Sequence, residues 1–322
     1  MTIENMEKQL KNKRLQLACK IILICISCFI LLEVGLRYLW GFCDALLYIH
    51  SDKYEYIAQP NQDHLRFGAH IHYNSFSQRS TEPNFNRTII LGLGDSVLFG
   101  GSWMDQDSLA STIFTQETGM QMLNISAGSW GPDNCAAYLK EKGTFNAKAM
   151  ILVCSSHDAY DVMSYLPVVG IYPNYPNKQY HSAIIELIDR YLLPKIKYYI
   201  SKTKMKLDPD ETVVSNITNS SVKKKSKQFN PGFNQLKSIA DSLRIPFGIY
   251  LHAETNEIAT QKYNDMGNEI IKWAQKHHVY LLKGIECGET PDMYKDAIHY
   301  NEKGQKHLAK SLIYLIKNID SK

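Results

Sequence analysis

The chain has 322 residues, which is long enough for one well-packed domain and additional segments. Hydrophobic residues make up 44% and charged residues 21% of the chain, an ordinary globular mixture that excludes a low-complexity protein. The net charge is only +4, and no motif interleaves basic with aromatic residues, so the sequence does not suggest a protein that binds nucleic acid.

The N-terminal segment has the pattern of a membrane anchor. Several basic residues precede an apolar stretch over residues 21–32, which by itself is as short as the core of a signal peptide. No small-residue cleavage site follows, and the helical pattern continues, with Glu33 and Arg37 spaced to pair on one face. We therefore predict a cytoplasmic tail at residues 1–14 and an uncleaved transmembrane signal anchor at residues 15–40. The rest of the chain would then be exported, to a periplasmic or extracellular location.

Residues 41–86 are rich in tyrosine, histidine, asparagine and glutamine and show little periodicity. We interpret them as a connecting segment that wraps around the domain. Within this segment, Arg79 is expected to have a structural role, clamping the segment to the sheet. The domain itself is predicted to occupy residues 87–322.

Five short apolar runs follow the connecting segment, each bounded by residues that are common in turns. Such runs are typical of strands buried on both faces of a parallel sheet. They cover residues 88–93, 120–125, 147–154, 246–251 and 279–282. Helical patterns lie at residues 109–118, from Pro132 onward, at 231–243, at 257–277 and up to residue 319. This alternation predicts one parallel sheet with helices on both faces, a three-layer α/β/α sandwich.

The first strand ends in Gly94-Asp95-Ser96, which places a serine at the carboxyl edge of the sheet, where open α/β sheets locate their chemistry. Three other glycine-rich motifs are excluded. A phosphate-binding loop requires a lysine that is missing here, and a dinucleotide fingerprint requires glycine in place of Val97. An α/β-hydrolase elbow requires glycine in place of Leu98.

A second group of residues lies near the C-terminus, where Asp296 precedes His299 by three residues. In a turn, this offset lets the carboxylate reach the imidazole and hold the tautomer that accepts a proton from Ser96. A lone Asp-x-x-His is a weak signal. Here it follows a Gly-Asp-Ser turn and a glycine at the next strand edge, all in order along the chain.

Together these motifs resemble the SGNH (GDSL) hydrolase family over roughly residues 87–318. The turn at Ser96 is similar to the family's first block, Gly128 to the glycine of its second block, and Asp296 with His299 to its last block. The resemblance implies a flavodoxin-like sheet and a catalytic triad of Ser96, His299 and Asp296. It also implies an oxyanion hole in which the backbone N–H groups of Ser96 and Gly128 act with a side chain from the third block.

The third block departs from the family pattern. The family has Gly-x-Asn-Asp, whereas this chain has Ser155-Ser156-His157-Asp158 after its third strand. Because an imidazole N–H can also donate a hydrogen bond, we favour His157 as a substituted oxyanion donor, which adds a dependence on pH. The alternative is that the oxyanion site is degraded and that His157 is only a hydrogen-bonded residue at the sheet edge.

The resemblance implies acyl transfer through an acyl-enzyme on Ser96, with no metal or organic cofactor. Membrane-anchored, exported members of the family often act on acetyl groups of polysaccharides. The expected activity is therefore that of a serine esterase acting on acyl esters, mainly acetyl esters, of cell-envelope or exported carbohydrate. Two alternatives stay open. The same triad would serve a polysaccharide O-acetyltransferase, and the fold would also serve a non-catalytic carbohydrate-binding or assembly protein, although retention of the triad argues against the latter.

Residues 159–230 interrupt the alternation of strands and helices and are predicted to form an insertion rich in tyrosine. As a lid, it would stack its tyrosines on a sugar ring. Alternatively, the aromatic side chains pack on the core, which is favoured for any single tyrosine. An amphipathic helix is expected at residues 182–200.

The remaining chemically reactive side chains are expected to be structural. Cys135, Cys154 and Cys287 belong to the exported domain, and their spacing fits neither a metal site nor a disulfide framework. Buried free thiols are favoured, with a disulfide between two of them left open. His252, at the end of the fourth strand, could support the catalytic residues from behind or be a core histidine, and we favour the latter.

Overall fold

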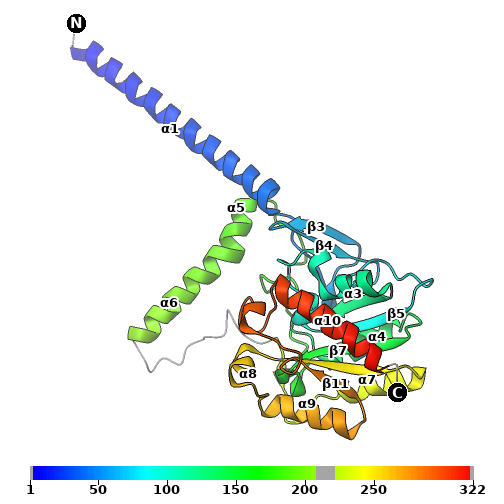
Figure 1. Ribbon diagram of the computed structural model, residues 1–322. Helices are drawn as coiled ribbons and strands as arrows, with labels where there is room; N and C mark the ends of the chain where they lie inside the picture. Colours follow the sequence, from blue (N-terminus) through cyan, green and yellow to red (C-terminus); the bar gives the residue numbers. More distant parts are fainter. Residues whose placement is uncertain (1–2, 208–221, 320–322) are drawn as a thin grey trace.

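A five-stranded parallel sheet forms the centre of the domain (Figure 1). The computed structural model describes residues 3–207 and 222–319. The strands of the sheet are β5 (Ile89–Gly94), β6 (Gln121–Ser126), β7 (Ala149–Ser155), β10 (Phe247–His252) and β11 (Tyr280–Lys283). They lie in the flavodoxin-like order β11-β10-β7-β5-β6, with every neighbouring pair parallel. The five predicted strands are confirmed, each beginning and ending one or two residues later than predicted.

Helices cover both faces of this sheet (Figure 1). One face packs against α3 (Ala110–Thr118) and α10 (Glu302–Ile319), and the other against α4 (Pro132–Lys142), α7 (Gly232–Leu243) and α9 (Asp265–Lys276). All residues of β5, β6, β7 and β10 are buried, which explains why their sequences are continuous apolar runs instead of alternating patterns. The three-layer α/β/α sandwich is therefore confirmed.

The prediction of a single helix at residues 257–277 is wrong. The chain forms two helices there, α8 (Thr255–Thr260) and α9, which are separated at Gln261. Gln261 has a left-handed backbone (φ 53°) that ends α8, and the Asn264 side chain accepts a hydrogen bond from the Gly267 N–H to begin α9. A single residue with a left-handed backbone leaves the spacing of the apolar residues unchanged, so the sequence analysis missed the break between α8 and α9.

The connecting segment contains two β-hairpins that were not predicted. One pairs β1 (Tyr48–Ser51) with β2 (Glu55–Ala58), and the other pairs β3 (Gln62–Arg66) with β4 (Ala69–Tyr73). Their buried aromatic and aliphatic side chains join the main hydrophobic core, among them Tyr54, Tyr56, Ile57, Ile71 and Tyr73. Strands of four or five residues are too short for an alternating pattern to stand out in the sequence.

The insertion is described up to residue 207 and again from residue 222. Strands β8 (Asp161–Val162) and β9 (Lys224–Lys225) pair at its base. Tyr172 and Tyr175 pack against the main core, and the ring of Tyr175 lies 4.7 Å from that of Tyr56, centroid to centroid. For these two tyrosines the packing interpretation is confirmed. The predicted amphipathic helix is also present, as α5 (Ala183–Glu186), a π-helical turn at Leu187–Leu192 and α6 (Leu193–Leu207).

Helix α1 (Ile3–Trp40) projects away from the domain (Figure 1). Its part from Lys11 to Trp40 is long and apolar enough to cross a membrane, and its apolar window is not buried by the rest of the protein. A signal sequence near an N-terminus meets the same criteria of length and composition. The predicted pair is present, with Arg37 Nε lying 2.7 Å from Glu33 Oε1.

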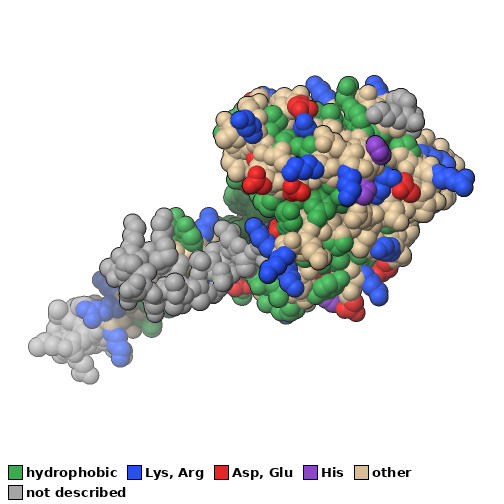
Figure 2. All heavy atoms as spheres, turned by 90° about the horizontal axis from the view of Figure 1, so that it is seen from below, with side chains coloured by type: hydrophobic (Ala, Val, Ile, Leu, Met, Phe, Trp, Pro, Cys, Tyr) green, Lys and Arg blue, Asp and Glu red, His purple; other side chains and the backbone are tan. Residues whose placement is uncertain are grey.

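The surface of the domain carries mixed charge. On the face shown in Figure 2, basic, acidic and hydrophobic side chains are interspersed, without a large area of one charge. A protein that tracks a phosphate backbone concentrates its lysine and arginine side chains in one patch or stripe. This face has no such patch. The thiols of Cys135 and Cys154 are free and buried, and that of Cys287 is free and half-buried.

Candidate active site

Ser96 lies where β5 ends and the short helix α2 (Ser96–Phe99) begins. Asp95 caps this helix, because its carboxylate accepts a 2.8 Å hydrogen bond from the Val97 N–H. Gly94 is needed at the end of the strand, since a Cβ there would lie 2.9 Å from the Val153 carbonyl oxygen. The local structure therefore holds Ser96, half-buried, at the carboxyl edge of the sheet.

The structure brings the three predicted triad residues together. The Nε2 atom of His299 lies 2.9 Å from the Oγ atom of Ser96. On the other side of the ring, Nδ1 lies 2.8 Å and 3.0 Å from the two carboxylate oxygens of Asp296. An imidazole placed between a hydroxyl and an orienting carboxylate is the arrangement that activates a serine nucleophile.

The turn that carries His299 is built around the carboxylate of Asp296. One carboxylate oxygen accepts hydrogen bonds from the N–H groups of Ile298 and His299, at 2.9 Å and 2.8 Å. Burial alone would raise the pKa of Asp296, but these N–H groups and the imidazole outweigh it and hold the pKa below its ordinary value. Asp296 is therefore ionised at neutral pH and orients the imidazole.

His252 does more than fill the core, which differs from the expectation. It is fully buried at the end of β10, and its Nε2–H donates a 2.7 Å hydrogen bond to the carbonyl of Ile298, directly before His299. Its Nδ1 atom lies 3.2 Å from Glu289. Burial alone would raise the pKa of Glu289, but the adjacent His252 lowers it to about 2. This buried pair supports the turn that carries His299, which is the less favoured of the two alternatives for His252, and Glu289 was not predicted.

Arg79 clamps the chain that follows Ser96. Its Nη1 atom donates 2.6 Å hydrogen bonds to the carbonyls of Phe99 and Gly101, and its Nη2 atom donates a 2.6 Å hydrogen bond to the carbonyl of Met104. The side chain is fully buried. The expected clamping role is confirmed, but the guanidinium binds the loop after α2, while only the backbone N–H of Arg79 reaches the sheet, at Asn124.

A hollow of about 160 Å³ adjoins Ser96 at the carboxyl edge of the sheet. Its lining includes Ser96, Ser129, Trp130, His157, Ile298 and His299. Gly128 comes directly before this lining in the chain, and an added Cβ at Gly128 would meet nothing closer than the Tyr175 hydroxyl, 3.9 Å away. The structure thus brings His157 into the same hollow as Ser96 and His299, with Gly128 next to it.

Glu254 is a partner of His157 that was not predicted. The Oε1 atom of Glu254 lies 3.0 Å from Nδ1 of His157. Burial alone would lower the pKa of His157, but this hydrogen bond and the carboxylates of Asp158 and Asp95 raise it to about 10. His157 is therefore an imidazolium at neutral pH, with two N–H donors. Glu254 comes two residues after β10, and its position at this sheet edge was the signal that could have found it.

Asp95, His157 and Asp158 could each offer one ligand atom to a metal ion, since these atoms lie within 4.8 Å of one another. However, Asp95 already caps α2, and Asp158 accepts a 2.8 Å hydrogen bond from the Ser155 N–H. Nδ1 of His157 likewise lies 3.0 Å from the carboxylate of Glu254. We therefore interpret the two carboxylates as electrostatic partners of the His157 cation.

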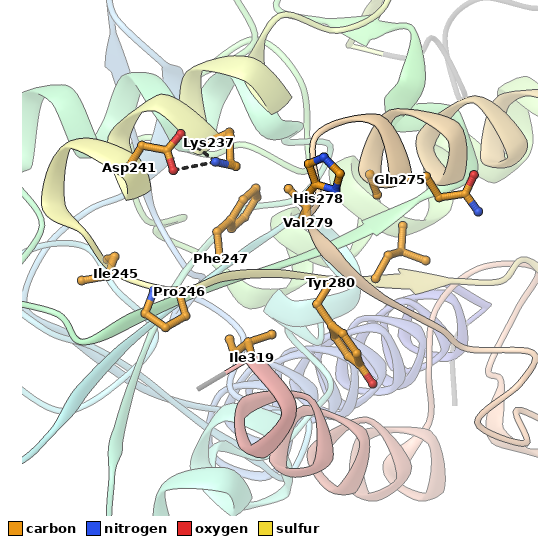
Figure 3. A pocket seen from close by; sticks show the side chains of 12 residues that line it. Lys237, Asp241, Ile245, Pro246, Phe247, Gln275, His278, Val279, Tyr280 and Ile319 are labelled. Atoms are coloured by element: carbon orange, nitrogen blue, oxygen red, sulfur yellow. Dashed lines mark hydrogen bonds and ion pairs between the residues drawn. The ribbon is translucent and has the colours of Figure 1, made fainter. Parts of the chain in front are cut away.

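A larger hollow of about 570 Å³ lies at the opposite edge of the sheet, near the amino ends of β10 and β11 (Figure 3). Phe247, Val279 and Tyr280 line it, together with the ion pair between Lys237 and Asp241. Open α/β sheets bind their ligands at the carboxyl ends of the strands. The smaller hollow beside Ser96 is therefore the candidate site.

Comparisons with known proteins give matches only at the level of structure. No family model and no curated protein matches the chain. Similar solved structures include a lipolytic protein of the G-D-S-L family from Desulfitobacterium hafniense, with 11% identity and a TM-score of 0.37. Others are the esterase EstA from Pseudoalteromonas sp., with 11% identity and a TM-score of 0.41, and the acetyl xylan esterase AlAXEase, with 9% identity and a TM-score of 0.39.

These alignments cover 70–73% of this chain and 98–100% of the three solved chains. At such TM-scores the similarity carries no argument about function, which depends on the geometry of the chain itself. The flavodoxin-like sheet and the hydrogen-bonded Ser96, His299 and Asp296 at its edge agree with what the resemblance of the sequence motifs to the SGNH (GDSL) hydrolases implies.

Proposed function

We propose that the chain is a serine esterase that acts on acyl esters, with Ser96 as its nucleophile. The observation that carries this proposal is the hydrogen-bonded path from Ser96 through His299 to Asp296. His299 takes the proton of Ser96 as the hydroxyl attacks the ester carbonyl, and Asp296 stabilises the imidazolium that forms. His299 then protonates the leaving alcohol, and water hydrolyses the acyl-enzyme.

The oxyanion of the tetrahedral intermediate is stabilised, in this proposal, by the backbone N–H groups of Ser96 and Gly128 and by His157. Each such donor typically contributes about 3 kcal/mol to the reduction of the barrier. The raised pKa of His157 supports its role, because a charged donor forms a stronger hydrogen bond to an anion than a neutral amide does. Glu254 then acts as a positioning residue that keeps the imidazole oriented and protonated.

The residues around Ser96 favour an ester that has a small acyl group and a carbohydrate as its alcohol. A hollow of about 160 Å³ suits an acetyl group better than a long acyl chain. Trp103 is 37% exposed, and its ring lies 5.6 Å from that of His299, centroid to centroid. The Lys295 ammonium lies over this ring, 3.5 Å from its centroid, so it is the uncovered part of the ring that offers an apolar surface to a sugar. We therefore assign acetyl esters of cell-envelope or exported carbohydrate as the substrate class.

The same proposal places the domain outside the cytoplasm, anchored by α1. Support comes from the length and apolar composition of the segment Lys11–Trp40 and from its exposure. Lys8, Lys11, Lys13 and Arg14 precede the apolar residues of this segment and favour a cytoplasmic N-terminus. An exported, anchored esterase would meet its substrate at the cell envelope.

Acetate release from acetylated xylan tests the substrate class. We expect the full-length protein in detergent to release acetate, and we expect Trp103→Ala to raise KM for the polysaccharide by about 5-fold, since an aromatic stacking contact contributes about 1 kcal/mol. The same variant should hydrolyse methyl acetate within about twofold of the wild type, because the methyl group of its alcohol is too small to stack on the tryptophan.

Hydrolysis of p-nitrophenyl acetate without release of acetate from the polysaccharide would contradict the carbohydrate assignment and leave the esterase proposal standing. Acetyl transfer to a xylo-oligosaccharide that outpaces hydrolysis would instead favour the O-acetyltransferase alternative. An equal rise in KM for both esters in Trp103→Ala would assign Trp103 a structural role.

A His157→Asn variant separates the charge of the third donor from its hydrogen bond. Asparagine keeps an N–H donor but has no positive charge. We expect kcat/KM for p-nitrophenyl acetate to fall about 10-fold in His157→Asn and about 100-fold or more in His157→Phe. Because the pKa of His157 is raised to about 10, its charge persists through the neutral range and is lost only as the pH rises through that value. The activity ratio of wild type to His157→Asn should therefore be constant from about pH 6 to pH 9 and then decline.

Both activities are compared at equal ionic strength, with non-enzymatic hydrolysis subtracted at each pH. A ratio that changes near pH 6.5 would identify an ordinary imidazole and contradict the charged donor. Wild-type activity in His157→Phe, with an unchanged melting temperature, would show that His157 does not act on the oxyanion at all.

A further inference from the structure

The insertion contains a long helix whose large apolar side chains face solvent. α5, the π-helical turn and α6 run on as one helix, and Figure 1 shows it leaving the domain beside the end of α1. A stripe of apolar residues recurs along it at helical spacing, with exposed fractions of 42% to 65%. The stripe consists of Ile185, Ile188, Leu192, Ile196 and Tyr199. A stripe of exposed apolar side chains along a helix marks a site that interacts with another apolar surface.

The start of this helix is bonded to α1. The carboxylate of Glu33 accepts hydrogen bonds from the N–H groups of Ala183 and Ile184, at 2.7 Å and 3.0 Å, and from the Ser182 hydroxyl at 2.9 Å. Arg37, which pairs with Glu33, donates to the carbonyl of His181. The N–H groups at the start of a helix lack partners within it, so Glu33 acts as a cap supplied by another element.

A second set of contacts fixes the direction of the helix. The buried carboxylate of Glu186 lies 2.6 Å from Nη2 of Arg66 on β3 and accepts a 2.5 Å hydrogen bond from the Cys43 N–H. Leu36 of α1 and Phe42 form a small apolar cluster with the first turn of the helix. The helix is therefore tied to α1, to the residues after α1 and to the first hairpins of the domain.

Glu33 also marks the level at which the apolar part of α1 ends. Residues 21–32 contain no charged side chain, and Glu33 and Arg37 follow. In a helix that crosses a membrane, charged side chains next to the apolar stretch lie at the interface with water. The helix that Glu33 caps therefore starts at the level of the membrane surface. Figure 1 shows it running across the direction of α1 instead of alongside it.

The charge of the helix matches a lipid surface. α6 carries five lysines and no acidic residue in its sequence, and Lys195 and Lys197 are exposed. An apolar stripe flanked by lysines is the pattern of a helix that lies in the interface plane, where lysines meet anionic headgroups.

We propose that the helix over residues 183–207 lies on the membrane surface, with the stripe from Ile185 to Tyr199 in the headgroup region. This inference rests on the proposed anchoring by α1. With two contacts, one across the membrane and one along it, the domain cannot rotate freely about its anchor. The membrane thereby sets the height and direction of the sheet edge that carries Ser96, and so the part of the cell envelope from which a substrate reaches it.

Tryptophan quenching by brominated lipids tests this placement in the full-length protein. The protein is reconstituted into vesicles of phosphatidylcholine and phosphatidylglycerol, with or without bromine on the acyl chains. Ile196→Trp puts the probe in the stripe, and Lys197→Trp puts it at the next, lysine-bearing position as a matched control. After subtraction of the wild-type emission, we expect bromine to quench Ile196→Trp at least about threefold more than Lys197→Trp, because interfacial helices bury their apolar face by about 5–10 Å.

Equal quenching of the two variants would overturn the proposal. A blue-shifted but unquenched emission from Ile196→Trp would assign the stripe to a protein surface, such as a second copy of the chain, and would overturn it as well. Co-sedimentation with the vesicles after an alkaline wash reports on α1 separately. Protein that washes off contradicts the anchor itself, whereas retained protein with equal quenching contradicts the surface helix alone.

Discussion

Replacing Ser96 with alanine is expected to lower kcat for p-nitrophenyl acetate by about 10⁴- to 10⁶-fold. The reason is that His299 Nε2 lies 2.9 Å from the Ser96 hydroxyl, and alanine leaves this base without a nucleophile to activate. The oxyanion donors remain in place, so a small residual rate over the uncatalysed reaction should persist. Initial rates of the full-length protein in detergent, with the fraction of acylated enzyme followed by mass spectrometry, measure the effect.

Ser238→Ala is the matched control for this substitution. Ser238 is exposed on α7, and its loss should change neither activity nor stability. Equal activity of Ser96→Ala and wild type would exclude Ser96 as the nucleophile. An inactive wild type that is folded and binds acetylated carbohydrate would favour the non-catalytic, carbohydrate-binding alternative.

Replacing Arg79 with methionine should lower the free energy of unfolding by about 3 kcal/mol or more. The guanidinium donates to the carbonyls of Phe99, Gly101 and Met104, all of which belong to buried residues. Methionine fills much of the same space but leaves these carbonyls without a donor, and each buried unsatisfied group costs about 1 kcal/mol or more. Urea unfolding followed by tryptophan fluorescence measures the loss. Because the loop follows Ser96 directly, kcat should fall as well, by about 10-fold or more.

Arg87→Met is the matched control, because Arg87 also donates to two backbone carbonyls, those of Gly119 and Thr115, but is only half-buried. Water can replace its hydrogen bonds, so its loss should cost less than about 1 kcal/mol. Similar losses for the two variants would mean that burial of the Arg79 clamp does not matter. A stable Arg79→Met with full activity would show that the loop keeps its position without the clamp.

Much of the fold could be predicted from short stretches of the sequence. Four of the five strands, β5, β6, β7 and β10, are buried on both faces, so their sequences are mainly apolar runs. The break between α8 and α9 was not readable, because it depends on one residue, Gln261, in a left-handed conformation. The hairpins in residues 41–86 were missed for a related reason, since their strands are short and depend on packing against the core.

The residues of the candidate site likewise fall into two groups, those that sequence motifs indicate and those that only the tertiary structure places. Ser96, Asp296 and His299 stand in motifs whose chemistry can be recognised one residue at a time, and the sequence alone indicated all three as candidates that the structure brings within hydrogen-bond distance. Glu254 and Glu289 stand in no motif. They matter because the tertiary structure places Glu254 3.0 Å from His157 and Glu289 3.2 Å from His252.

The sequence by itself determined the order of strands and helices, the three triad candidates and an apolar segment long enough to span a membrane, because each of these depends on neighbouring residues in the chain. Only the tertiary structure decided the protonation of His157, the support of the His299 turn and the position of the insertion helix at the end of α1. A pKa, a buried hydrogen bond and a helix cap depend on the distance between groups that are far apart in sequence. Glu33 and Ala183, separated by 150 positions and joined by a 2.7 Å hydrogen bond, illustrate the difference.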